Sequence, residues 1–134
     1  MGAWGNGVWQ DDVAHDVILR FEQLLAEGRT PGEAVQQILL DPPWGWGDQD
    51  DDVVQVLALA ALALQQGVLD TALRDRAISL IESGEPLDRW TESEPEKSAA
   101  RQALLDHFKA LLVRGTATVE ELASVTEPKA FSLW

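Results

Sequence analysis

The chain of 134 residues contains no cysteine, and its ten lysines and arginines are few beside 23 aspartates and glutamates. Without cysteine, disulfide bonds and thiolate metal sites are excluded. The formal net charge of −13 disfavours contact with phosphate backbones and anionic lipid headgroups, and it favours basic partners. We therefore expect no nucleic-acid partner.

Long hydrophobic runs are also missing. The longest apolar stretch, Val56 to Leu64, is shorter than the ~20 residues that a membrane-spanning helix needs, and glutamines lie on both sides of it. The first basic residue is Arg20, so the amino terminus lacks the basic region of a signal peptide. These features predict a cytoplasmic protein with no membrane partner.

Phosphate-binding loops are absent as well. The glycine-containing segments GAWGNG and WGWG have no strand before them and no lysine within them, and both lie close to aspartates. A bound nucleotide is therefore not expected, and the sequence predicts no cofactor.

Apolar residues recur at helical spacing through most of the chain, whereas no segment shows the alternation of a strand. Thr30-Pro31-Gly32-Glu33 and Thr118-Val119-Glu120-Glu121 each carry a capping-box pattern for the start of a helix. A short helical turn that carries Leu87 and Trp90 is expected from Pro86. The main helices are expected at about 13–27, 31–40, 50–66, 70–83 and 95–114, with a short one after 118.

These elements predict an all-α fold, a single-domain helical bundle of about five main helices spanning residues 1–134. The segment 50–66 is apolar all round between Val56 and Leu64, so it should be the central helix. The Trp/Gly-rich segment 1–10 is expected to pack on the bundle, and residues 125–134 form a tail.

The amino-terminal segment carries a recognisable pattern of residues, namely Met1, Gly2, Trp4, Gly5, Gly7 and the spacing Asp12-x-Ala14-x-Asp16. In this pattern the chain resembles the DUF4259 domain family of small uncharacterised bacterial proteins. Trp9 stands where that family usually has phenylalanine, and Asp11 where asparagine is common. The resemblance implies a small cytosolic bacterial domain and brings no catalytic residues with it.

The loop from Pro42 to Gly47 sets Trp44 and Trp46 beside four aspartates, Asp48, Asp50, Asp51 and Asp52. Tryptophan in a loop either packs down over the core, which is our expectation here, or is displayed to a partner. Exposed tryptophans frequently dominate binding energy at protein interfaces, and the surrounding carboxylates would steer a basic partner. These six residues are the candidate partner-binding site.

Acidic residues gather in three places: at 11–16, at 48–52 and between Glu82 and Glu96. The first two precede helices, where carboxylates cap free N–H groups and complement the helix dipole. The alternative is a hard-cation site formed by Asp12, Asp16, Asp50 and Asp51. The acidic loop lacks the ligand alternation and closing glutamate of a twelve-residue calcium loop.

His15 and His107 are the only histidines, and each is adjacent to an aspartate in sequence. Neighbours on a helix point about 100° apart, so adjacency does not imply a hydrogen bond, and no nucleophile motif accompanies either residue. We interpret both as ordinary surface or boundary residues.

The favoured hypothesis is a non-enzymatic, acidic interaction domain, such as an immunity-type inhibitor or an adaptor, that binds a basic macromolecular partner. The alternative is a divalent-cation-binding protein or a metal-dependent hydrolase that uses the aspartate cluster. A homo-oligomer with tryptophans at its interface is a third interpretation, because the sequence leaves the oligomeric state open.

Overall fold

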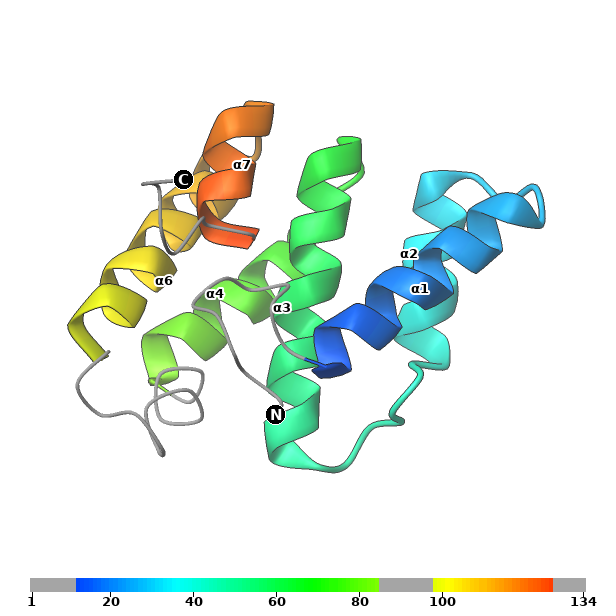
Figure 1. Cartoon of the computed structure of the whole chain (residues 1–134), viewed down its shortest axis with the longest axis horizontal. Coiled ribbons are helices and arrows are strands. Elements are labelled where there is room, and N and C mark those ends of the chain that lie inside the picture. The colour runs from blue at the N-terminus through cyan, green and yellow to red at the C-terminus, as the bar shows by residue number, and fades with distance from the viewer. Residues whose placement is uncertain (1–11, 85–97, 127–134) are drawn as a thin grey trace, which may run out of the picture.

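The computed structural model describes residues 12–84 and 98–126, and within these residues every regular element is a helix (Figure 1). The all-α prediction is confirmed. The predicted packing of residues 1–10, the turn with Leu87 and Trp90, and residues 127–134 of the predicted tail lie outside the described residues. Val125 and Thr126, which were expected in the tail, belong to the last described helix. The helices are α1 (Asp12–Ala26), α2 (Pro31–Leu40), α3 (Gln49–Gln66), α4 (Thr71–Ser83), α6 (Ser98–Arg114) and α7 (Val119–Thr126).

Local capping sets where the helices begin and end. At α2, the Glu33 N–H donates to Thr30 Oγ1 at 3.2 Å, and the Thr30 N–H donates to Glu33 Oε1 at 2.9 Å. These hydrogen bonds form the predicted capping box, and the one from the Thr30 backbone contributes most to lowering the pKa of Glu33. At α4, Asp70 Oδ1 accepts the Leu73 N–H at 2.7 Å, and Gly84 ends the helix in the left-handed conformation.

Helix α3 is the central element, as predicted, and Figure 1 shows it between α1 and α2 on one side and α4, α6 and α7 on the other. It contacts α1, α2, α4 and α7. Every residue from Val53 to Leu64 is buried, including four alanines whose small side chains let neighbouring helices approach closely. An apolar helix surface of this kind has to be covered on all sides, which explains its position.

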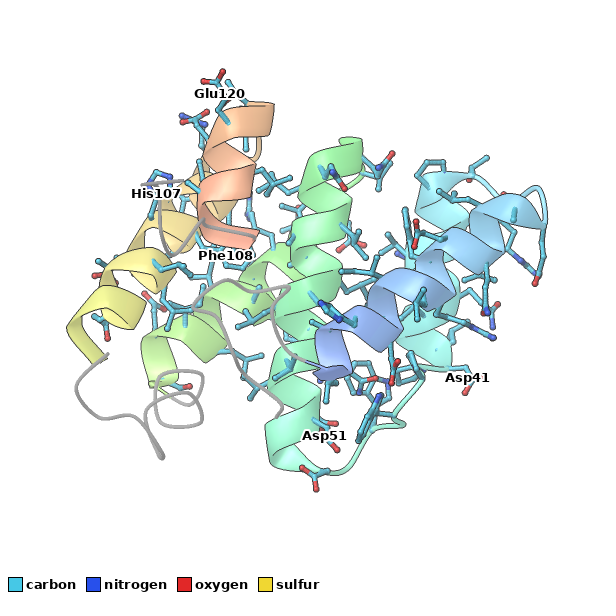
Figure 2. The ribbon with its side chains drawn as sticks, viewed as in Figure 1. Asp41, Asp51, His107, Phe108 and Glu120 are labelled. Atoms are coloured by element: carbon cyan, nitrogen blue, oxygen red, sulfur yellow. The ribbon has the colours of Figure 1, made fainter. Side chains whose placement is uncertain are left out.

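The second half of the molecule packs on α3 through α4 and α7, and α6 packs on both of these helices. Phe108 of α6 is fully buried (Figure 2), and Lys109 forms an ion pair of 2.8 Å with Glu82 of α4. Among the residues that the structure describes, no helix is long and apolar enough to cross a membrane.

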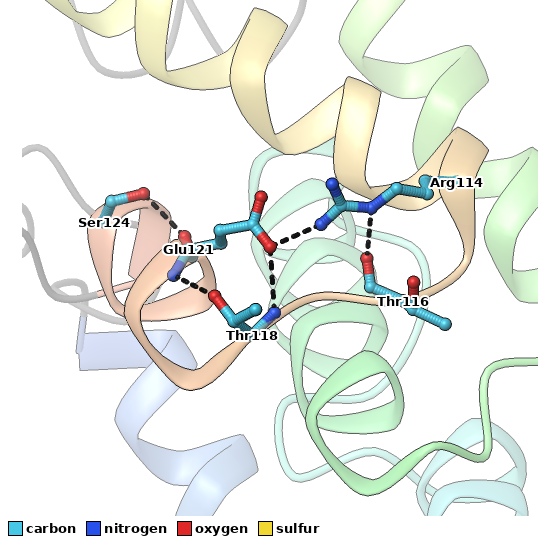
Figure 3. A network of polar contacts seen from close by, with 5 residues as sticks. All are labelled: Arg114, Thr116, Thr118, Glu121 and Ser124. Carbon is cyan, nitrogen blue, oxygen red and sulfur yellow. Dashed lines mark hydrogen bonds and ion pairs between the residues drawn. The ribbon is translucent and has the colours of Figure 1, made fainter.

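A polar network joins α6 to α7 (Figure 3). Arg114 Nη2 donates to Glu121 Oε1 at 2.6 Å, and the same oxygen accepts the Thr118 N–H at 3.0 Å. The Glu121 N–H donates to Thr118 Oγ1 at 3.1 Å, so the second predicted capping box is confirmed. First the Arg114 hydrogen bond, and then that of the Thr118 backbone, lower the pKa of Glu121 to about 2.

Candidate functional site

Residues 41–48, which connect α2 to α3, form the segment that we call the Trp loop. It contains a turn closed by a hydrogen bond of 3.0 Å from the Gly45 N–H to the Pro42 carbonyl. Gly45 and Gly47 have φ values of +67° and +126°, a region that residues with a side chain rarely adopt. The alternation of tryptophan and glycine therefore presents two indole rings from a sharply folded backbone.

Gln55, in the second turn of α3, holds the backbone of the Trp loop through its side chain. Its side chain is only 1% exposed. Gln55 Oε1 accepts the Trp44 N–H at 3.0 Å, and Gln55 Nε2 donates to the Gly45 carbonyl at 2.9 Å. Because both ends of the buried amide are satisfied by the loop, the loop conformation and the packing of α3 are coupled.

Both indole N–H groups of the Trp loop are also bonded within the protein. Trp44 Nε1 donates to Asp16 Oδ2 of α1 at 2.7 Å, and Trp46 Nε1 donates to the Leu39 carbonyl of α2 at 2.9 Å. Nevertheless Trp44 is 47% exposed and Trp46 is 37% exposed. The expectation that these rings pack down over the core is wrong, because both side chains stay exposed although their N–H groups are bonded within the protein.

Arg76 of α4 covers part of the Trp46 ring. The guanidinium of Arg76 lies over the Trp46 ring, 4.8 Å from its centroid. An arginine at this distance is attracted by the negative face of the indole. The Trp loop is therefore connected to α1, α2, α3 and α4.

The aspartates of the candidate site have local structural partners. Asp48 Oδ1 accepts the Asp51 N–H at 3.2 Å at the start of α3, and both carboxylate oxygens of Asp52 accept the Gly47 N–H, at 3.1 and 3.2 Å. The side chain of Asp50 lies outside the described residues. Helix capping therefore accounts for the position of Asp48, and closure of the loop accounts for that of Asp52. Their negative charges also remain at the surface beside the tryptophans.

The alternative metal site was assigned to Asp12, Asp16, Asp50 and Asp51. In the part of the chain that the structure describes, no three histidine, cysteine, aspartate or glutamate side chains are grouped so as to hold a metal ion. One oxygen of Asp16 is already bonded to Trp44. The side chains of Asp12 and Asp50 are not among those described, so this alternative stays a prediction.

Exposed apolar side chains adjoin the Trp loop. Leu40, the last residue of α2, is 81% exposed, and Leu19 of α1 is 57% exposed. We call Leu19, Leu40, Trp44 and Trp46 the Trp–Leu surface. Leu40 directly precedes the loop in the chain, and Leu19 lines a hollow together with Pro42 and Pro43. Exposed large apolar side chains that lie near one another are typical of an interaction site.

An open hollow of about 420 Å³ lies between α1 and the first residues of the Trp loop. Its walls combine apolar groups with charges of both signs. The lining residues are Asp16, Leu19, Arg20, Gln23, Asp41, Pro42 and Pro43. Figure 2 shows Asp41 where α2 gives way to the loop and Asp51 at the start of α3, so acidic side chains stand at both ends of the loop.

The two histidines differ in their position relative to the Trp loop and in their burial. His107 is exposed on α6, on the far side of α3 from the Trp loop (Figure 2), and His15 is half-buried on α1. Among the described residues, neither belongs to a group of three or more side chains that could hold a metal ion. The interpretation as surface and boundary residues is confirmed for their burial.

Two important residues of this region, Gln55 and Arg76, were not singled out from the sequence. Gln55 did leave a signal, because a polar residue beside an otherwise apolar helical stretch needs a partner once the helix is buried. Arg76 left none, since an arginine on an amphipathic helix is ordinarily solvent-exposed.

No protein-family model matches the chain, and no curated protein or solved structure matches it either. The resemblance to the DUF4259 family therefore stays a prediction, and function has to be argued from the surface itself.

Proposed function

We propose that this chain is a non-enzymatic binding protein that receives a basic protein partner on the Trp–Leu surface, as an immunity-type inhibitor or an adaptor would. The observation that carries the proposal is the state of Trp44 and Trp46. Their indole N–H groups are bonded internally, whereas 47% and 37% of their surfaces stay exposed.

Such an arrangement favours binding because the rings are held in place before a partner arrives. Side chains that are ordered only on association oppose binding by roughly 0.5–1.5 kcal/mol each. The hydrogen bonds to Asp16 and Leu39 and the support of Gln55 have already fixed the two indoles. Buried aromatic anchors are the residues that most often dominate interface energetics.

The charge of the chain supports a basic partner. The net charge is −13, and Asp41 and Asp48 are exposed at the edge of the Trp–Leu surface. Carboxylates at the rim of an apolar surface accelerate association with a positively charged protein and disfavour an acidic one.

The test is capture of partners from native cell extract, followed by reconstitution of the complex from the purified partner and measurement of its Kd. Leu40→Ser and Leu19→Ser each remove an apolar side chain that is more than half exposed. We expect each to weaken the complex about tenfold, since truncating a central interface residue costs about 1–2 kcal/mol.

Val113→Ser is the matched control, because Val113 is 59% exposed but lies on α6, across the molecule from α2 (Figure 1). The Kd of the complex should be unchanged in Val113→Ser. For the native chain, the affinity should fall as the ionic strength rises. Equal loss of affinity in Val113→Ser and Leu40→Ser, or affinity that is independent of salt, would contradict the proposal.

A further inference from the structure

We infer that an arginine of the partner binds at the exposed part of Trp44 and in the hollow lined by Pro43, its neighbour in the chain, and by Asp16, its hydrogen-bond partner. This inference rests on the proposed function and specifies the chemical group that the Trp–Leu surface recognises. Trp46 already has an arginine of this chain over its ring.

Trp46 shows how an indole of the Trp loop receives a guanidinium. Its N–H is bonded to the Leu39 carbonyl, and Arg76 lies over its ring at 4.8 Å. The N–H fixes the orientation of the ring, and the cation then occupies the negative π face.

Trp44 also has its indole N–H bonded within the protein, but it lacks an overlying cation from the described part of the chain. Its N–H is bonded to the Asp16 carboxylate at 2.7 Å, which fixes the ring. Among the residues that the structure describes, no cation lies over Trp44, and the side chain is 47% exposed. An oriented indole is thus partly exposed at the surface, next to a carboxylate.

The adjoining hollow supplies the counter-charge. Asp16 and Asp41 line it, and within the described part of the chain the exposed carboxylate of Asp41 has neither a hydrogen bond nor an ion pair. A guanidinium is planar, so it can stack on an indole and at the same time donate several hydrogen bonds to a carboxylate. A lysine ammonium offers no such plane, which is why the arrangement favours arginine.

Arg20 lines the same hollow and carries the opposite charge. Two carboxylates therefore face one guanidinium of the chain itself, and the excess is negative. Because Arg20 repels an incoming arginine, Arg20→Gln should tighten binding of an arginine ligand by about twofold, whereas loss of a carboxylate should weaken it.

The probe is Nα-acetyl-arginine amide, titrated into the full ¹⁵N-labelled chain while the indole resonances are followed by NMR. The Trp44 indole signal is assigned with Trp44→Phe and that of Trp46 with Trp46→Phe. We expect the arginine probe to shift the Trp44 signal at millimolar concentration, and the isosteric but uncharged citrulline amide to leave it in place.

Asp16→Asn/Asp41→Asn removes both charges but keeps an oxygen acceptor for the Trp44 indole, and it should raise the Kd of the probe about fivefold. Glu22→Gln is the matched control, because Glu22 is an exposed acid of α1 that does not line the hollow. Equal shifts with citrulline amide, or equal loss of affinity in Glu22→Gln, would overturn the inference.

Failure of the inference can be distinguished from failure of the proposed function. If the probe leaves Trp44 unshifted while Leu40→Ser still weakens the complex with the partner, the Trp–Leu surface binds a partner by other contacts and the arginine site is wrong. If Leu40→Ser has no effect on the partner, the proposed function itself fails.

Discussion

At the scale of single residues, Gln55 links the interior to the candidate site. Its buried amide bonds the Trp44 N–H and the Gly45 carbonyl. We expect Gln55→Ala to lower the free energy of unfolding by about 1–3 kcal/mol for each loop group left without a partner. Thermal and urea unfolding measure this loss, and faster hydrogen exchange at the Trp44 amide would show that the loop has been released.

Gln65→Ala provides the comparison for Gln55, because Gln65 lies on the same helix and its side chain is exposed. Truncation there should change stability by no more than about 0.5 kcal/mol. If Gln55→Ala is as stable as Gln65→Ala, and hydrogen exchange at the Trp44 backbone amide is unchanged, the loop holds its conformation without the Gln55 side chain.

The residue types of the candidate site could be predicted from the sequence, whereas the contacts between those residues could not. Trp44 and Trp46 were singled out by their residue type and by the glycines between them. The contact of Trp44 with Asp16 joins residues 28 positions apart, and Arg76 reaches Trp46 from α4. Such contacts depend on how α1 and α4 pack around α3, which periodicity within one segment does not specify.

At the scale of elements, the helices could be predicted because their signals are local. The capping boxes at Thr30 and Thr118 and the glycines after α1, α3, α4 and α6 lie within a few residues of the boundaries that they set. The central position of α3 followed from its apolar surface alone. The sequence did not predict which helices would cover α3 or that the Trp loop would lie across Gln55, because both depend on tertiary packing.

The junction of α6 and α7 should depend on pH through Glu121. Its folded pKa of about 2 lies below the ordinary glutamate value of 4.5, chiefly because of the Arg114 hydrogen bond. A lowered folded pKa means that the carboxylate stabilises the fold above about pH 4.5 and that this stabilisation is lost as the pH falls toward 2. We therefore expect Glu121→Gln to be less stable than the native chain at pH 6 and to approach it near pH 2.

Other carboxylates also titrate in this range, so the difference between variant and native chain is the quantity to follow, by thermal unfolding at several pH values. Glu120→Gln serves for comparison, since Glu120 is an exposed neighbour on the same helix (Figure 2). A destabilisation by Glu121→Gln that stays constant from pH 6 to pH 2 would mean that the ionised Arg114–Glu121 contact contributes nothing to stability.

At the scale of the whole molecule, the charge of −13 acts against the compact fold, because like charges repel one another in the folded state. We expect Tm at pH 7 to rise as sodium chloride increases, since the Debye length falls from about 30 Å at 0.01 M to about 3 Å at 1 M. Chloride is the appropriate salt because sulfate would strengthen apolar burial directly. Near the pI of about 4.3 the net charge approaches zero, so the same titration should leave Tm almost unchanged. A Tm that falls with salt at pH 7 would show that favourable ion pairs, such as Lys109–Glu82, outweigh the repulsion.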